Sequence, residues 1–115
     1  MEHRLQSRAH LKTWVRVIPP AGHGLLGNIE DISTGGLGVL HDRPMPIDTE
    51  CNVYFMLPLG AFETIVQARC RIAACHQQDA ACFHIGLQFL DFVTDTREAQ
   101  DAIHRFQHQL QTAGR

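Results

Sequence analysis

The sequence predicts an all-β domain that ends in one helix, arranged as a six-stranded antiparallel β-barrel. Six short runs that contain apolar residues are separated by glycine, proline and polar clusters, which is typical of strands and turns. After residue 94 the apolar residues recur at three- and four-residue spacing, which indicates an amphipathic helix. Strands followed by one helix favour a small barrel whose open end or side the helix covers.

Each expected strand has its own pattern. The first is β-branched and aromatic, and it stops at Pro19-Pro20. The fourth and fifth strands alternate apolar and polar side chains, so one face of each is expected to be buried. Turns are expected at 58–61, around a proline and a glycine, and at the polar residues 77–79. The six expected strands are 12–18, 25–31, 37–41, 51–57, 64–74 and 82–92.

The C-terminal helix is expected over about 95–111. Asp95 and Glu98 have the spacing of a capping box, with Asp in the place of Ser or Thr. Gly114 stands just past the expected end. The apolar stripe that this helix would turn toward the barrel consists of Ala99, Ala102, Ile103, Phe106 and Leu110.

The length of 115 residues predicts one domain with a modest core. Residues 1–11 show no clean period and are expected to form a flexible basic arm, and 12–115 form the barrel domain with its helix. The first sixteen residues hold four basic side chains against Glu2 alone, whereas the whole chain has a net charge of −2. A basic arm on an acidic body suits a small anionic ligand better than a nucleic-acid duplex, so no nucleic-acid partner is expected.

The composition is that of an ordinary globular protein, with 44% hydrophobic and 19% charged residues. No run approaches 18 apolar residues, so no membrane span is expected. The N-terminus lacks the apolar stretch of a secretory signal, which predicts a cytoplasmic protein. The four cysteines form no C-x-x-C pair, and disulfides are not expected in that compartment.

The segment from Asp31 to Gly36 (Asp-Ile-Ser-Thr-Gly-Gly) stands between two apolar runs and predicts a tight polar turn between strands. The Asp31 carboxylate can accept hydrogen bonds from the N–H groups of a purine edge, and the Ser33 hydroxyl can accept or donate one. Gly35 and Gly36 allow the backbone to approach a ligand closely or to take a positive φ. The same residues also fit an ordinary hairpin turn in which Asp31 and Ser33 bond their own backbone.

Two arginines near the N-terminus, Arg4 and Arg8, are four positions apart. A guanidinium contacts phosphate and the O6/N7 edge of guanine in a bidentate way, and it stacks on flat rings. Such a pair alone is also typical of a solvated basic tail. The order of the two motifs is more specific, because the Asp31 motif follows the arginine pair by about two dozen residues, with one expected strand between them.

Together the two motifs resemble the sequence signature of the PilZ domain family, RxxxR followed by D/N-x-S-x-x-G. Every position is filled: Arg4 and Arg8, then Asp31, Ser33 and Gly36. The run Ile85-Gly86-Leu87-Gln88-Phe89 also looks like the last strand of that family. The resemblance covers essentially the whole chain, and it implies a six-stranded antiparallel barrel with a C-terminal helix.

Members of this family bind cyclic di-GMP, a bacterial second messenger. The resemblance implies that Arg4 and Arg8 clamp phosphates and guanine faces. It implies that Asp31 and Ser33 bond guanine edges, and that the backbone at 35–36 comes close to the ligand. Such a ligand, with two phosphates and two flat rings, requires guanidiniums that both pair and stack. An arm that is mobile without ligand would order around it and change the surface that a partner meets.

The implied function is that of a receptor that binds cyclic di-GMP and regulates a protein partner in motility, pili, exopolysaccharide production or virulence. The alternative is a PilZ-like adaptor that contacts proteins and binds no nucleotide. A small barrel that binds single-stranded nucleic acid would need aromatic side chains interleaved with basic ones, and the acidic body disfavours it. His3 stands directly before Arg4, at a position that in the family influences whether one ligand or a stacked pair is bound, and both alternatives stay open here.

No metal and no cofactor are expected. His104 and His108 have a spacing that can hold zinc on a helix, but no H-E-x-x-H pattern accompanies them. A looser alternative joins Cys75-His76 to Cys82 and His84 across a hairpin.

No catalytic residue is expected either. Ser33 is not part of a G-x-S-x-G elbow. Cys51 and Cys70 fall on strand faces that are expected to be buried, where a thiol acts as a small hydrophobic group.

Overall fold

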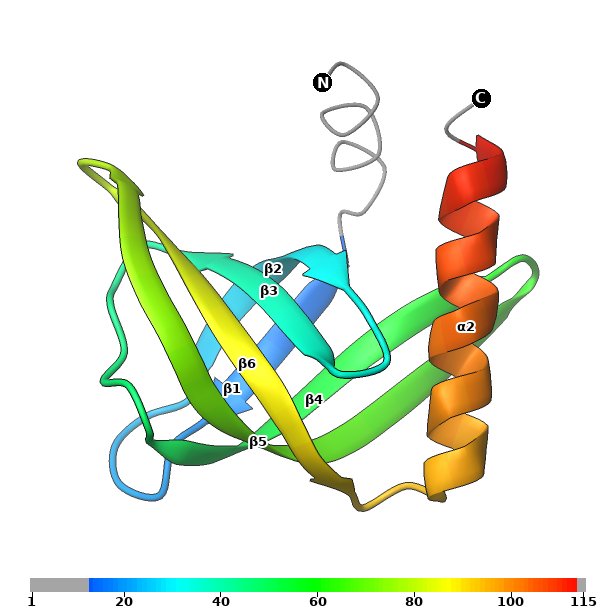
Figure 1. Ribbon diagram of the computed structural model, residues 1–115, viewed down its shortest axis with the longest axis horizontal. Helices are drawn as coiled ribbons and strands as arrows, with labels where there is room; N and C mark the ends of the chain where they lie inside the picture. Colours follow the sequence, from blue (N-terminus) through cyan, green and yellow to red (C-terminus); the bar gives the residue numbers. More distant parts are fainter. Residues whose placement is uncertain (1–12, 114–115) are drawn as a thin grey trace.

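The computed structural model describes residues 13–113 and shows a closed barrel of six antiparallel strands (Figure 1). Around the barrel the order is β1-β2-β3-β6-β5-β4, and β4 pairs back onto β1. The predicted fold class is therefore confirmed, whereas the expected arm 1–11 lies outside the described residues. The elements are β1 (Trp14–Ile18), β2 (Leu25–Ile32), β3 (Gly36–His41), β4 (Glu50–Leu59), β5 (Phe62–Asp79), β6 (Cys82–Phe92) and α2 (Thr96–Ala113).

The two hairpins made by β5 are longer than the sequence predicted. β4 continues through Pro58, which pairs with Glu63, and the turn is only Gly60 and Ala61, with Gly60 at a φ of 63°. Pro58 is tolerated because it lies beyond the part of β4 that pairs with β1, where a strand edge needs no further donor. At the other end β5 runs to Asp79, whose Oδ1 accepts a hydrogen bond from the Ala81 N–H at 3.0 Å. Cross-strand pairing thus extends each strand into residues whose local preference is a turn.

The core fills the inside of the barrel, and it consists of the inward half of each alternating strand. Phe55 on β4, Ile72 on β5 and Val15 on β1 are fully buried. Burying a side chain of this size stabilises the fold by roughly 1.5–3 kcal/mol. The alternation that the sequence showed on β4 and β5 is confirmed, since Val53, Phe55, Leu57, Val66, Ala68, Cys70 and Ile72 are all buried.

Helix α2 packs on the barrel through the predicted apolar stripe, with Ile103 and Phe106 buried against the core. Its first turn is capped as predicted by Asp95, whose Oδ1 accepts a hydrogen bond from the Glu98 N–H at 3.0 Å. Figure 1 shows the helix upright beside the barrel, next to the β4–β5 turn and the β2–β3 turn. Gln109 bonds the Gly60 N–H and the Pro58 carbonyl, so the helix is fastened to the first of these turns.

Within residues 13–113, no helix has both the length and the apolar character needed to cross a membrane.

Candidate functional site

The segment from Asp31 to Gly36 forms the corner between β2 and β3, as the sequence predicted. The Ser33 N–H donates to the Gly36 carbonyl at 2.9 Å, and the Ser33 Oγ accepts from the Gly35 N–H at 3.2 Å. Ser33 therefore does bond its own backbone. Because its oxygen serves there as an acceptor, the hydroxyl proton remains available to donate to a ligand. We refer to Asp31, Ser33, Gly35 and Gly36 as the corner.

A β-bulge decides which way Asp31 points. Strict alternation from the buried Ile29 would turn Asp31 inward as well. The pairing of β2 with β3 shifts between these two residues, so Glu30 is an extra residue in the ladder. Ile32 takes the inward place instead, and the Asp31 side chain is 65% exposed on the outer surface. The bulge thus converts a core position into a surface carboxylate.

The outward Asp31 carboxylate meets a histidine from the far side of β3. His84 on β6 places its Nε2 3.5 Å from Asp31 Oδ2 and 3.4 Å from Oε1 of the buried Glu30. The His84 ring also stacks on His76 of β5, with centroids 5.2 Å apart. Within residues 13–113 the His84 Nδ1 is buried with no hydrogen-bond partner. A proton on Nε2 faces two carboxylates, so Nε2 is the nitrogen that carries it.

The glycines near this contact have different tasks. A Cβ at Gly38 would lie within 2.7 Å of both the Asp31 carboxylate and the His84 Nε2, so only glycine lets these groups meet across β3. A Cβ at Gly36 would overlap the backbone of Leu87, so Gly36 permits close pairing with β6. A Cβ at Gly35 would meet only the Ser33 Oγ, at 3.8 Å, and this side of the corner is open. Of the two corner glycines, Gly35 is thus the one whose surface a ligand can approach.

The corner also lies close to the place where the N-terminal segment enters the fold. Thr13 is buried, and its carbonyl accepts a hydrogen bond from the Ile29 N–H at 2.9 Å. The segment that carries Arg4 and Arg8 therefore joins the barrel beside β2, two positions before Asp31. Arg4 and Arg8 themselves lie outside the described residues.

The outward arginines of β5 are engaged elsewhere. Arg69 pairs with Glu50 and, at 2.7 Å, with Asp91, and the hydrogen bond and charge of Asp91 raise the pKa of Arg69. Arg71 pairs with Asp48 and donates to Gln88 at 2.6 Å. These guanidiniums hold β5 to its neighbours and leave little free positive charge on that face.

Glu30, Asp31 and His84 form a group of side chains, within residues 13–113, whose ligand atoms lie within 4.8 Å of one another. Two carboxylates and an imidazole are a donor set that a divalent ion can use. To bind a metal through Nε2, however, His84 would have to carry its proton on the buried Nδ1, which has no acceptor among the described residues. The geometry therefore suits hydrogen bonding better than metal binding.

The cysteines of the inner barrel are core residues. Burial raises the pKa of Cys51 to about 11 and that of Cys70 to about 12, so both thiols are protonated at neutral pH. Such thiols are poor nucleophiles.

Comparison with known families decides what this barrel is. A family model for the PilZ domain matches residues 2–106. The chain belongs to the PilZ domain family. PilZ domains are binding and adaptor domains, and they are generally receptors for cyclic di-GMP. No curated protein matches this chain with significant similarity.

In this PilZ domain the sequence located the corner but not the residues that support it. Gly38 carries no local signal, because its importance arises only when β2, β3 and β6 come together. His84 was visible only as a loose metal candidate with Cys82. An acidic residue in the middle of an apolar strand, as Glu30 is, was the one signal that could have indicated a bulge.

Proposed function

We propose that this PilZ domain protein is a cytoplasmic bacterial receptor for cyclic di-GMP. Asp31 and Ser33 bond guanine edges, and the open surface at Gly35 lets the nucleotide approach the backbone, while Gly36 holds the corner against β6. Arg4 and Arg8 supply the phosphate and ring contacts. The observation that supports this best is the bulge that turns the Asp31 carboxylate outward, beside the point where the N-terminal segment joins the barrel.

The charges at the corner fit this division of tasks. Asp31 offers acceptors to the N–H groups of a guanine edge, and Ser33 offers a hydroxyl proton. Within residues 13–113, neither side chain contacts a lysine or an arginine. A ligand with two phosphates needs cations as well, and Arg4 and Arg8 are the cations that the adjoining segment carries.

Nucleotide binding would order residues 1–11 against the barrel and alter the surface that a partner protein meets. The energy for this ordering comes from the charged contacts of the two arginines. The proposal invokes no cofactor and no catalytic step.

Calorimetric titration of the intact protein with cyclic di-GMP tests this function. Saturable binding is expected, and Arg4→Ala or Arg8→Ala should abolish it while Ser33→Ala should weaken it. Arg97→Ala is the matched control, because Arg97 is an exposed arginine at the start of α2. Circular dichroism should be the same for all variants, which shows that each of them is folded. The titration also gives the stoichiometry, one nucleotide or a stacked pair.

Absence of binding in the unmutated protein would overturn the receptor proposal. A protein-interaction adaptor is then the better description, and an exposed apolar groove on another side of the barrel favours it. In that case a pull-down should recover the same partner with and without nucleotide.

A further inference from the structure

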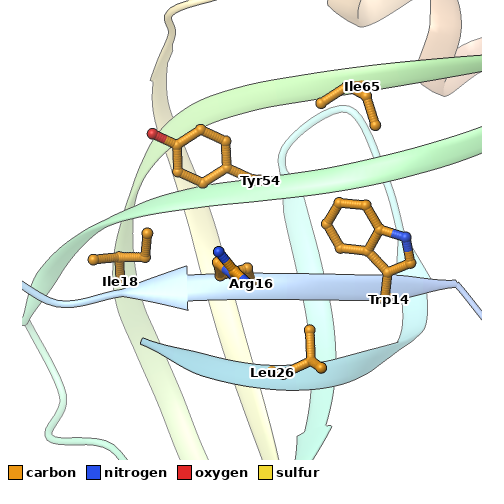
Figure 2. Close-up of a pocket in the computed structure, with 6 residues that line it drawn as sticks. All are labelled: Trp14, Arg16, Ile18, Leu26, Tyr54 and Ile65. Atoms are coloured by element: carbon orange, nitrogen blue, oxygen red, sulfur yellow. The ribbon is translucent and has the colours of Figure 1, made fainter. Parts of the chain in front are cut away.

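The outer surface of the barrel has an apolar groove of about 660 Å³ on the side of β1. Figure 2 shows its side chains projecting from β1, from β2 and β4 on either side of it, and, at Ile65, from β5 beyond β4. The volume is in the range of sites that hold small molecules or short peptide segments. The groove is lined by Trp14, Arg16, Ile18, Leu26, Tyr54 and Ile65.

The groove is open to solvent although its walls are apolar. Leu26 is 62% exposed and Ile65 is 52% exposed, and Trp14 between them is 37% exposed. Scattered apolar side chains are normal on a protein surface, but these gather around one hollow. Apolar side chains that meet on a surface in this way mark an interaction site.

The polar groups of the groove are donors. Arg16 lies directly across from Leu26 on β2 and from Tyr54 on β4, so it stands in the middle of the groove. The Tyr54 hydroxyl accepts a hydrogen bond from Gln67 Nε2 at 2.9 Å, which leaves its own proton free to donate. In residues 13–113, Arg16 has no ion pair and no side-chain hydrogen bond, in contrast to Arg69 and Arg71.

The positive charge of Arg16 disfavours two of the possible occupants of this groove. The chain's own N-terminal segment carries Arg4, Arg8 and Lys12 against one acidic residue, so it would bring like charge to Arg16. A second copy bound about a two-fold axis through the groove would place Arg16 against its own counterpart. Both arrangements set cations together in an apolar environment, which is costly.

We propose that this groove docks a segment of a partner protein in which apolar side chains flank a carboxylate. The carboxylate pairs with Arg16 and accepts from the Tyr54 hydroxyl, and the apolar side chains pack on Trp14, Leu26 and Ile65. This inference deepens the proposed function by giving the chemistry of the partner, and it does not require that nucleotide binds.

Phage display of random peptides against the intact protein tests the groove. Panning should enrich peptides in which Asp or Glu is flanked by Leu, Ile or Phe. Trp14 is the one tryptophan of the chain, so its fluorescence reports occupancy of the groove directly. A synthetic peptide from the enriched set should change the Trp14 emission saturably, and the same peptide with Glu replaced by Gln should bind more weakly.

Three variants assign the binding to this surface, and all of them keep Trp14. Arg16→Glu should weaken the peptide by at least ~10-fold, because it sets a carboxylate against a carboxylate. Leu26→Ser should weaken it about threefold to tenfold through lost apolar contact. Arg97→Glu makes the same charge change on α2 and should leave the affinity unchanged. Circular dichroism and the melting temperature confirm that each variant is folded.

Several results would overturn this proposal. Enriched peptides without acidic residues, an unchanged Trp14 emission, or full affinity in Arg16→Glu would each do so. Nuclear Overhauser contacts between the Trp14 indole and residues 1–12 would assign the groove to the chain itself. A dimer that Leu26→Ser dissociates would assign it to a second copy. Competition between peptide and cyclic di-GMP, together with loss of nucleotide binding in Arg16→Glu, would assign the groove to the nucleotide. Failure of the protein to bind cyclic di-GMP at all bears only on the receptor proposal.

Discussion

The corner and the groove are both on the outer surface of the barrel, but they are built in different ways. The corner depends on a bulge in β2, on glycines at 36 and 38, and on contacts that reach across three strands to His84. The groove needs only the outward half of regularly alternating strands. Four of its six side chains are exposed, Ile18 and Tyr54 are half-buried, and Arg16 at its centre has no partner in residues 13–113.

This difference has a consequence for how each surface tolerates change. At and beside the corner, Gly36 and Gly38 are enclosed by neighbouring backbone and side chains, so adding one methyl group at either position disturbs the strand pairing. In the groove, exposed side chains such as Leu26 and Ile65 can be replaced with little effect on the fold, because they bury little area. Mutations at the enclosed glycines should therefore reduce stability, whereas mutations of the exposed groove side chains should affect binding alone.

The largest expected effect is on stability at Gly36. Gly36→Ala should lower the free energy of unfolding by about 3 kcal/mol, because the new Cβ would overlap the Leu87 carbonyl. Gly35→Ala is the matched control and should change it by less than about 1 kcal/mol, since that position is open. Leu26→Ala in the groove should change it by less than about 0.5 kcal/mol. Urea denaturation measures all three, and equal losses at Gly35 and Gly36 would contradict the distinction between them.

The next prediction distinguishes the two surfaces by the ligand that each of them binds. Asp31→Ala should lower the affinity for cyclic di-GMP at least ~10-fold, because a charged hydrogen bond is worth about 1.5–3 kcal/mol. Leu26→Ser should leave that affinity unchanged and reduce only the affinity for the groove peptide. Calorimetry with each ligand on each variant completes the test. If Leu26→Ser also reduced nucleotide binding, the two regions would have to be regarded as one site.

A third effect concerns the two thiols on the core side of β4 and β5. The pKa of Cys51 is about 11 and that of Cys70 about 12 in the fold, against an ordinary value of 9.0. Between pH 9 and 11 the unfolded chain therefore loses thiol protons that the fold retains, and stability falls as the pH rises. The loss should reach about 1 kcal/mol per thiol by pH 10. Urea denaturation at pH 8 and at pH 10 measures this loss of stability. Between these pH values Cys70→Ala should lose less stability than the unmutated protein. An equal loss in both proteins would mean that water reaches the Cys70 thiol in the folded core.

The smallest effect concerns the support of Asp31. His84→Leu should lower the affinity for cyclic di-GMP about threefold to fivefold, because the contacts of Nε2 are long and worth about as much as a neutral hydrogen bond. His76→Leu removes the stacked ring but leaves those contacts, and it should have less effect. Titration calorimetry distinguishes the two variants. A larger loss in His76→Leu would show that stacking, not the polar contact, holds His84 in place.

Local pattern was sufficient to predict most of the fold. The alternation in β4 and β5 correctly predicted which face is buried, and the three- and four-residue spacing correctly predicted the helix and its cap at Asp95. The turns were less predictable. Pro58 and Asp79 favour turns locally, but both are paired in strands because partners elsewhere in the chain extend the ladder.

The sequence by itself determined the family of this protein and the order of its elements, because side-chain periodicity and a spaced motif depend only on neighbours along the chain. Only the tertiary structure decided that Asp31 faces outward, since the bulge is a mismatch between two strands and appears in neither alone. The same holds for the groove. Leu26, Arg16 and Tyr54 come from three strands, and closure of the barrel is what places them side by side.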